Sequence, residues 1–197
     1  DNDTQVEGDE VTVTGSLQDG FLDQNSNNYK FSTKARVLRT TTGYCHGYLF
    51  SANTAFTSGS FVEEVPYDPE LLFIGEEPSL ALRAWTNGYN IFHMKDIPTR
   101  HYYGRDYRGT FWDPQNNPDV WQAKEITSDI RLADLYQEKI KGIYGLGSKR
   151  SLGAYIRYCG IDYRNKTFET RAYTGNVVHA LDYKKQLETE EWYSGEA

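Results

Sequence analysis

The sequence has only two cysteines, one methionine, no excess of basic residues and no long apolar run. Cys45 and Cys159 stand far apart and fit no metal-binding spacing. The formal net charge of −7 argues against a nucleic-acid partner, because no basic stripe exists to neutralise phosphates. No stretch approaches the roughly 20 apolar residues of a membrane-spanning helix. The cysteine content favours two buried thiols in a reducing compartment, with a single disulfide as the alternative.

Aromatic residues are what the sequence has in abundance. It contains 16 tyrosines, 9 phenylalanines and 4 tryptophans, with a mean hydropathy of −0.71. Such a mix is frequent in carbohydrate-handling proteins, because flat rings with a polar edge match the faces of sugars. A tyrosine-rich β-structured surface has the same composition, so composition alone favours neither reading. At 197 residues the chain is one large domain or a part of a larger protein.

Apolar patterning predicts strands that alternate with helices. Residues 100–118 carry no such pattern and are expected to form a long loop, which in compact domains is usually functional. Alternating strands and helices predict an α/β domain. Strands are expected at 11–13, within 29–38, and at 47–50, 71–74, 89–93 and 177–183, and helices at 58–65, 78–87, 128–141 and 148–159.

The most informative segment is the turn at Gly75-Glu76-Glu77, where an expected strand gives way to a helix. Pro78 suits a first helical turn and Asn87-Gly88 supplies a stop signal. The positive end of the helix is expected to favour the ionised forms of Glu76 and Glu77. Acidic residues are also common there for stability alone. The glycine, the doubled acid and the aromatic surroundings together make the turn a candidate site.

A second segment, residues 99–108, holds one histidine, three arginines and three tyrosines. Arginine binds phosphate oxygens bidentately, and histidine or carboxylate completes a divalent metal shell. Trp112, shortly after it, could provide a stacking platform. These residue types together fit an anionic, metal-bridged ligand such as a nucleotide diphosphate. For His101 the alternative is a loop histidine satisfied by its neighbours.

Several short motifs follow one another along the chain. They are Val65-Pro66-Tyr67-Asp68-Pro69, Phe73-Ile74-Gly75-Glu76-Glu77, Arg83-Ala84-Trp85-Thr86-Asn87-Gly88-Tyr89, His101-Tyr102-Tyr103, Trp112-Asp113, the run from Tyr144 to Leu152, and Gly160-Ile161-Asp162. In this order they resemble a glycosyltransferase family identified as GlcNAc transferases, whose best-known eukaryotic members transfer GlcNAc from UDP-GlcNAc to a hydroxyproline of a cytoplasmic protein. The resemblance covers roughly residues 43–163.

The resemblance implies the C-terminal portion of a GT-A domain, which is a Rossmann-like α/β fold with a mixed sheet and flanking helices. It implies a hexosyltransferase that uses a UDP-sugar with Mn²⁺ or Mg²⁺ and a protein or glycan hydroxyl as acceptor. The Gly-Glu-Glu turn is also similar to the corresponding turn of the polypeptide GalNAc transferases. By resemblance, Glu76 and Glu77 are the catalytic carboxylates, His101 is the metal ligand, and the donor- and acceptor-binding residues are Gly75, Arg83, Trp85, Tyr102, Arg105, Arg108 and Trp112.

The chain departs from the family at its start. Family members carry an Asp-x-Asp or Asp-x-His motif after an upstream strand, whereas Asp1-Asn2-Asp3 follows no apolar strand. The sequence therefore divides into a polar segment over 1–42, partly strand, an acceptor-side half over 43–163, and a tail over 164–197 with a late strand. Such a half is expected to lack full donor binding and activity by itself.

The sequence also leads to two further expectations and two competing functions. The family implies a cytoplasmic location and retention of anomeric configuration. A competing hypothesis is a non-catalytic carbohydrate-binding or interaction module derived from such an enzyme. A hydrolase ranks low, because Glu76 and Glu77 project from the same turn rather than from opposite sides of a sugar ring.

Overall fold

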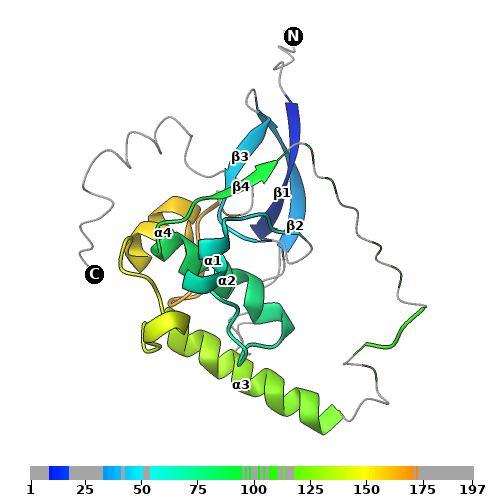
Figure 1. Cartoon of the computed structure of the whole chain (residues 1–197), viewed down its shortest axis with the longest axis vertical. Helices are drawn as coiled ribbons and strands as arrows, with labels where there is room; N and C mark the ends of the chain where they lie inside the picture. Colours follow the sequence, from blue (N-terminus) through cyan, green and yellow to red (C-terminus); the bar gives the residue numbers. More distant parts are fainter. Residues whose placement is uncertain are drawn as a thin grey trace.

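The computed structural model describes residues 9–17, 33–40, 43–50, 54–94, 118–170 and 172, together with residues 96, 98, 102, 104, 107–110 and 113. Two hairpins, β1 (Asp9–Leu17) with β2 (Thr33–Thr40) and β3 (Tyr44–Gly47) with β4 (Ile91–Met94), lie at one end (Figure 1). Helices α1 (Gly59–Glu64), α2 (Glu76–Thr86) and α4 (Leu152–Cys159) lie below them, and the long helix α3 (Pro118–Tyr136) runs along the opposite edge.

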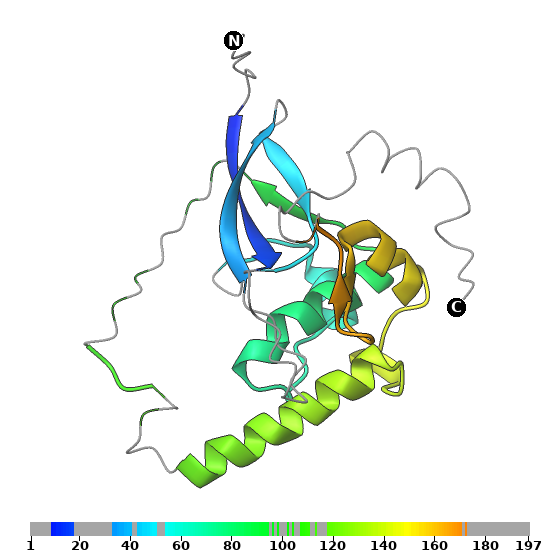
Figure 2. The ribbon, with the colours of Figure 1, turned by 180° about the vertical axis from the view of Figure 1, so that it is seen from behind.

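The strands pair in three antiparallel hairpins, which are β1 (Asp9–Leu17) with β2 (Thr33–Thr40), β3 (Tyr44–Gly47) with β4 (Ile91–Met94), and β5 (Ile161–Asp162) with β6 (Thr167–Phe168). The last hairpin lies beside α4 and is seen from behind (Figure 2). In the second hairpin Gly47 pairs with Ile91, and a Cβ on Gly47 would overlap the imidazole of His93. Combined with the helices, these hairpins confirm the expected α/β class.

Helix α2 (Glu76–Thr86) ends as its sequence predicts. Gly88 has a φ of 90°, and its N–H donates to the carbonyl of Trp85 at 2.9 Å. Helix α4 (Leu152–Cys159) begins at Ser151, whose hydroxyl accepts from the N–H of Ala154, and ends at Gly160 with a φ of 74°. Glycine at such a left-handed position avoids the steric cost of a Cβ.

The core is built largely from aromatic rings. Trp85 stacks on Tyr158, with ring centroids 5.6 Å apart. The hydroxyl of Tyr155 donates to the carbonyl of Tyr48 at 2.5 Å. Five of the tyrosines therefore serve the interior, where burial of each ring is favourable, and the hydroxyls of Tyr48, Tyr155 and Tyr158 donate to backbone carbonyls. The tyrosines buried in this way are Tyr48, Tyr136, Tyr155, Tyr158 and Tyr163.

The remaining helices are α1 (Gly59–Glu64), α3 (Pro118–Tyr136), and the 3₁₀ turns η1 (Phe73–Gly75) and η2 (Gly142–Tyr144). Helix α3 begins ten residues before the predicted 128. The strand expected at 71–74 is wrong, because η1 occupies that place and the N–H of Leu72 donates to the hydroxyl of Ser128 at 2.9 Å instead of joining a ladder. The strand expected at 177–183 lies outside the described residues.

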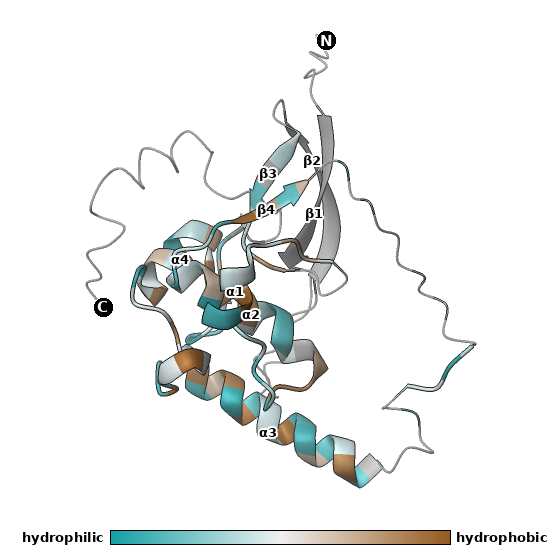
Figure 3. Ribbon diagram, viewed as in Figure 1, coloured by the Kyte–Doolittle hydropathy of each residue, from teal (hydrophilic) through white to brown (hydrophobic). Residues whose placement is uncertain are grey.

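Hydrophilic and hydrophobic residues alternate along the helices, most visibly on α3 (Figure 3). Among the described residues, no helix combines the length and the apolar character needed to cross a membrane. Cys159 carries a buried thiol.

Candidate functional site

The turn at Gly75-Glu76-Glu77 joins η1 to α2, and both glutamates lie in the first turn of the helix. The backbone N–H of Glu76 donates to the carbonyl of Phe73. In return, the Glu76 carboxylate accepts a hydrogen bond from the N–H of Phe73. Phe73 has a φ of 55°, a left-handed conformation that costs a bulky residue about 1–2 kcal/mol. The two-way exchange with Glu76 therefore holds a strained turn in place.

The protonation behaviour of Glu76 differs from the expectation. We expected the positive end of the helix to favour its ionised form. That is wrong for Glu76, because burial raises the pKa of its carboxyl and the charge of Glu77 raises it further, while the hydrogen bond from Phe73 opposes them. Desolvation disfavours the charged form more than the hydrogen bond favours it. A carboxylate with a raised pKa is the stronger base once ionised.

Gly75 lets the turn approach α3 closely. A Cβ on Gly75 would overlap Cδ1 of Leu132 and would lie 3.0 Å from its Cγ. Leu132 is buried in the main core cluster, so its side chain cannot move aside into solvent. The absence of a side chain at Gly75 thus fixes how near the two glutamates lie to α3.

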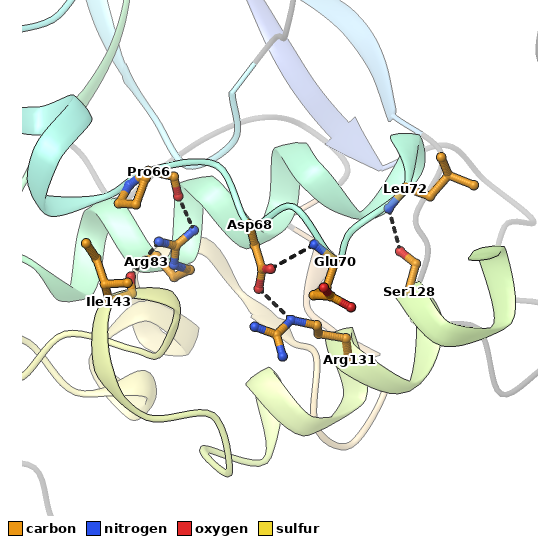
Figure 4. Close-up of polar contacts among 8 residues, drawn as sticks. All are labelled: Pro66, Asp68, Glu70, Leu72, Arg83, Ser128, Arg131 and Ile143. Carbon is orange, nitrogen blue, oxygen red and sulfur yellow. Dashed lines mark hydrogen bonds and ion pairs between the residues drawn. The ribbon is translucent and has the colours of Figure 1, made fainter.

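The segment before the turn, residues 66–72, is fastened to the helices around it (Figure 4); we call it the anchored loop. At its start the guanidinium of Arg83 donates to the carbonyl of Pro66 at 2.8 Å and to the carbonyl of Ile143 at 2.7 Å. Arg83 is 1% exposed, and burial lowers its pKa. Arg83 was predicted to bind donor or acceptor. The structure places it inside the fold, where it joins two distant backbone segments, and its contact with a ligand stays a prediction.

The middle of the anchored loop is held by a charge pair. Asp68 Oδ2 accepts from Nε of Arg131 on α3 at 2.7 Å, and the other carboxylate oxygen accepts from the N–H of Glu70 at 3.1 Å. The Asp68 side chain is only 3% exposed, so both of its bonds form in a poorly solvated place where they are strong. With the bond from Leu72 to Ser128, α3 fastens the loop at two points three residues apart along the helix (Figure 4).

Trp85, another predicted ligand-binding residue, is a core residue. It is 0% exposed, and the guanidinium of Arg150 lies 4.7 Å from the centre of its ring. Arg150 in turn donates to the carbonyls of Gly88 and Tyr89. Trp85 therefore supports the helix that carries the glutamates, and a direct contact with substrate stays a prediction.

The basic and aromatic segment predicted to hold the diphosphate is described in part. Tyr102 and Tyr107 lie with ring centroids 5.8 Å apart, and both are exposed. Nε of Arg108 donates to the hydroxyl of Tyr107 at 3.3 Å. His101, Arg105 and Trp112 lie outside the described residues, so their predicted roles stay predictions.

A metal site cannot be built from the described residues alone. No group of three or more histidine, cysteine, aspartate or glutamate side chains gathers among them in a way that could hold an ion. The predicted ligand, His101, belongs to the part of the chain that is not described.

Three residues that position the candidate site were not among the predicted site residues: Asp68, Ser128 and Arg131. Asp68 stands in the Pro-Tyr-Asp-Pro motif, for which the sequence predicted no function of its own. Ser128 and Arg131 are three residues apart, a spacing that puts two side chains on one face of a helix. This spacing is visible in the sequence, but only the fold identifies the loop that these side chains hold.

With this geometry in place, the chain can be compared with known proteins. A family model described as Glycosyltransferase (GlcNAc) matches residues 7–143, which is more than half of the 197-residue chain. The match includes the anchored loop, the Gly-Glu-Glu turn and the whole of α3. A search of curated proteins and a search of solved structures each found no match.

Proposed function

Because the chain belongs to the GlcNAc glycosyltransferase family, we propose that it transfers a sugar, GlcNAc, from a UDP-sugar to a hydroxyl acceptor in a metal-dependent reaction. The observation that carries this proposal is the family match over 7–143, which spans the Gly-Glu-Glu turn. The hold on that turn supports it, since Gly75 packs against α3 and the preceding loop is tied to α2 and α3. A rigid support is what a catalytic carboxylate needs to stay in register with its substrate.

In this proposal the two glutamates have different tasks. Glu76 shapes the turn through Phe73 and lends its charge to the sugar as positive charge develops on it. Glu77 accepts the hydrogen bond of the acceptor hydroxyl. The resemblance assigns His101 to the metal, and Arg105, Arg108 and Tyr102 to the diphosphate, with Trp112 as a stacking platform. A bound Mn²⁺ or Mg²⁺ would supply charge that offsets the leaving phosphate.

The reaction exchanges one bond to the anomeric carbon for another. The bond from this carbon to the UDP oxygen breaks, and a bond from the acceptor oxygen forms. The acceptor proton leaves to a base, for which a carboxylate or a phosphate oxygen of the departing UDP is suitable. A carboxylate fixed beside the sugar stabilises the cationic transition state without reorganising, which is the larger effect in such sites.

The test measures UDP release from UDP-GlcNAc with Mn²⁺ and a panel of hydroxyl acceptors, and it uses the full-length protein because the acceptor-side half by itself is expected to lack activity. We compare the unmodified protein with Glu77→Gln and His101→Ala, and we use Glu63→Gln on the exposed face of α1 as a matched control. Loss of a catalytic carboxylate or a metal ligand is expected to lower kcat by about 100-fold or more. The control should keep its rate.

Equal turnover in all three variants would remove the site assignment. No UDP release by the unmodified protein with any acceptor would remove the transferase proposal itself. Sugar binding on a glycan array without nucleotide, in the absence of any turnover, would instead favour the non-catalytic carbohydrate-binding module.

A further inference from the structure

Tyr67 combines an exposed side chain with a firmly held backbone. The residue is 52% exposed, although both of its neighbours are tied down. Pro66 is bound through its carbonyl by the buried Arg83, and Asp68 is bound by Arg131. Exposed tyrosines on loops usually have no such hold, because a surface ring gains little from a fixed position.

The side chains that hold the neighbours of Tyr67 are charged and buried, and removing a charge from water costs free energy. Arg83 and Asp68 are charged side chains removed from water, and each is compensated by hydrogen bonds at 2.7–2.8 Å. Buried ion pairs add little net stability compared with apolar packing, and where they are kept they can fix one conformation. Here the conformation they fix is that of the loop carrying Tyr67.

The hydroxyl of Tyr67 lies where the charges of the candidate carboxylates act on it. Burial raises the pKa of this hydroxyl, and the charges of Glu76 and Glu77 raise it further. The hydroxyl is protonated at neutral pH, as in an ordinary tyrosine, and is therefore a hydrogen-bond donor. Among the described residues, no group forms a hydrogen bond with it.

We propose that Tyr67 is an acceptor-positioning residue, whose ring packs against the apolar face of an acceptor sugar and whose hydroxyl donates to that sugar. This inference rests on the proposed transferase function and names its acceptor class as a carbohydrate. A sugar ring offers axial C–H groups to an aromatic face and hydroxyls at its edge, which matches the apolar body and polar tip of tyrosine. Glu77 then accepts from the sugar hydroxyl that attacks.

The chemical step is unchanged by this assignment. The acceptor sugar hydroxyl forms the new bond to the anomeric carbon of the donor, the bond to UDP breaks, and the proton leaves to the base already named. Tyr67 neither gains nor loses a proton. Its contribution is to hold the acceptor, so it should affect the KM for the acceptor and leave donor cleavage by water unchanged.

The experiment separates acceptor use from donor use. One assay measures UDP release from UDP-GlcNAc in water, and a second measures transfer to a panel of methyl glycosides and to a hydroxyproline-containing peptide. We compare the unmodified protein with Tyr67→Phe and Tyr67→Ala. Tyr44→Ala is the control, because Tyr44 is 39% exposed and lies on β3. Thermal melts establish that each variant is folded.

We expect Tyr67→Phe to raise the KM for the glycoside about fivefold, which corresponds to one neutral hydrogen bond. Tyr67→Ala should raise it at least tenfold, since the ring is lost as well. Acceptor-free UDP release should remain as in the unmodified protein, and Tyr44→Ala should change neither quantity.

Three results would overturn the inference. One is a KM for the glycoside that changes no more in Tyr67→Ala than in Tyr44→Ala. Another is equal loss of acceptor-free UDP release, which would place Tyr67 on the donor side. The third is transfer to the peptide alone, which would contradict the carbohydrate acceptor.

Saturation-transfer NMR with the same glycosides, without nucleotide, reports ring contact independently of turnover. Tyr67-dependent sugar contact in a protein that never releases UDP would contradict the transferase function while keeping the sugar site. Turnover that is unaffected by changes at Tyr67 would contradict the acceptor-positioning role while keeping the transferase function.

Discussion

Replacing Gly75 by alanine tests whether the contact between the Gly-Glu-Glu turn and α3 sets the position of the glutamates. The new methyl group would overlap Cδ1 of Leu132 and would lie 3.0 and 3.3 Å from its Cγ and Cδ2. Optimal contact between carbon atoms is about 3.5–4.0 Å, so the turn or the leucine must shift. Overpacking of this kind costs about 1–3 kcal/mol. We expect Gly75→Ala to lower the free energy of unfolding by that amount in a guanidinium titration followed by tryptophan fluorescence.

A double-mutant cycle makes this prediction specific. Leu132→Ala alone should cost about 2–5 kcal/mol as a cavity forms. Combined with Gly75→Ala, the loss should be smaller than the sum by about 1 kcal/mol or more, because the new methyl occupies the space that the leucine leaves. Gly59→Ala is the control, since a Cβ there meets nothing within 4 Å. Strict additivity, or an equal effect of Gly75→Ala and Gly59→Ala, would refute the close-packing argument.

Two further predictions concern the stability of the described fold. Asp68→Asn should lower the free energy of unfolding by about 1.5–3 kcal/mol, because the charged partner of Arg131 is lost; a change below about 0.5 kcal/mol in chemical denaturation would mean that the loop is not held by this pair. Burial lowers the pKa of His93 to about 4 from 6.5, so the unfolded chain binds a proton that the folded chain refuses between these values. The contribution of His93 to the free energy of unfolding should therefore fall as the pH drops from about 6.5 toward 4, by at most about 3 kcal/mol. His93→Gln should remove this contribution in denaturation curves recorded across the range, while His46, whose pKa burial also lowers, keeps its own.

The sequence predicts those parts of the fold whose signals are local. Helix α2 and its stop at Asn87-Gly88 follow from short-range rules about termini. The strand expected at 71–74 fails because the partner that takes the N–H of Leu72 is Ser128, 56 residues away. The apolar run looks like a buried strand, whereas the exposed Phe73 in η1 shows that local hydrophobicity does not decide it.

The candidate site, too, could be predicted from the sequence only in part. The motif order leads to Glu76 and Glu77 without any structure. The raised pKa of Glu76 could not be read from the sequence, because the helix end and burial act in opposite directions and only the fold gives the extent of burial. The residues that hold the anchored loop, Asp68 and Arg131, are ordinary surface types by composition and become informative only once they are seen paired.

The bond from Arg83 to Ile143 has a practical consequence for anyone who expresses part of this protein. Residue 143 is where the family match stops, and it is also where Arg83 finds its second carbonyl. The chain beyond it supplies Leu152, Tyr155 and Ile161 to the same interior that contains Trp85. A fragment trimmed to the matched range would leave one side of α2 without its partner and expose that interior to water. The range matched by the family model is therefore shorter than the unit that folds. Expression should extend at least to residue 172.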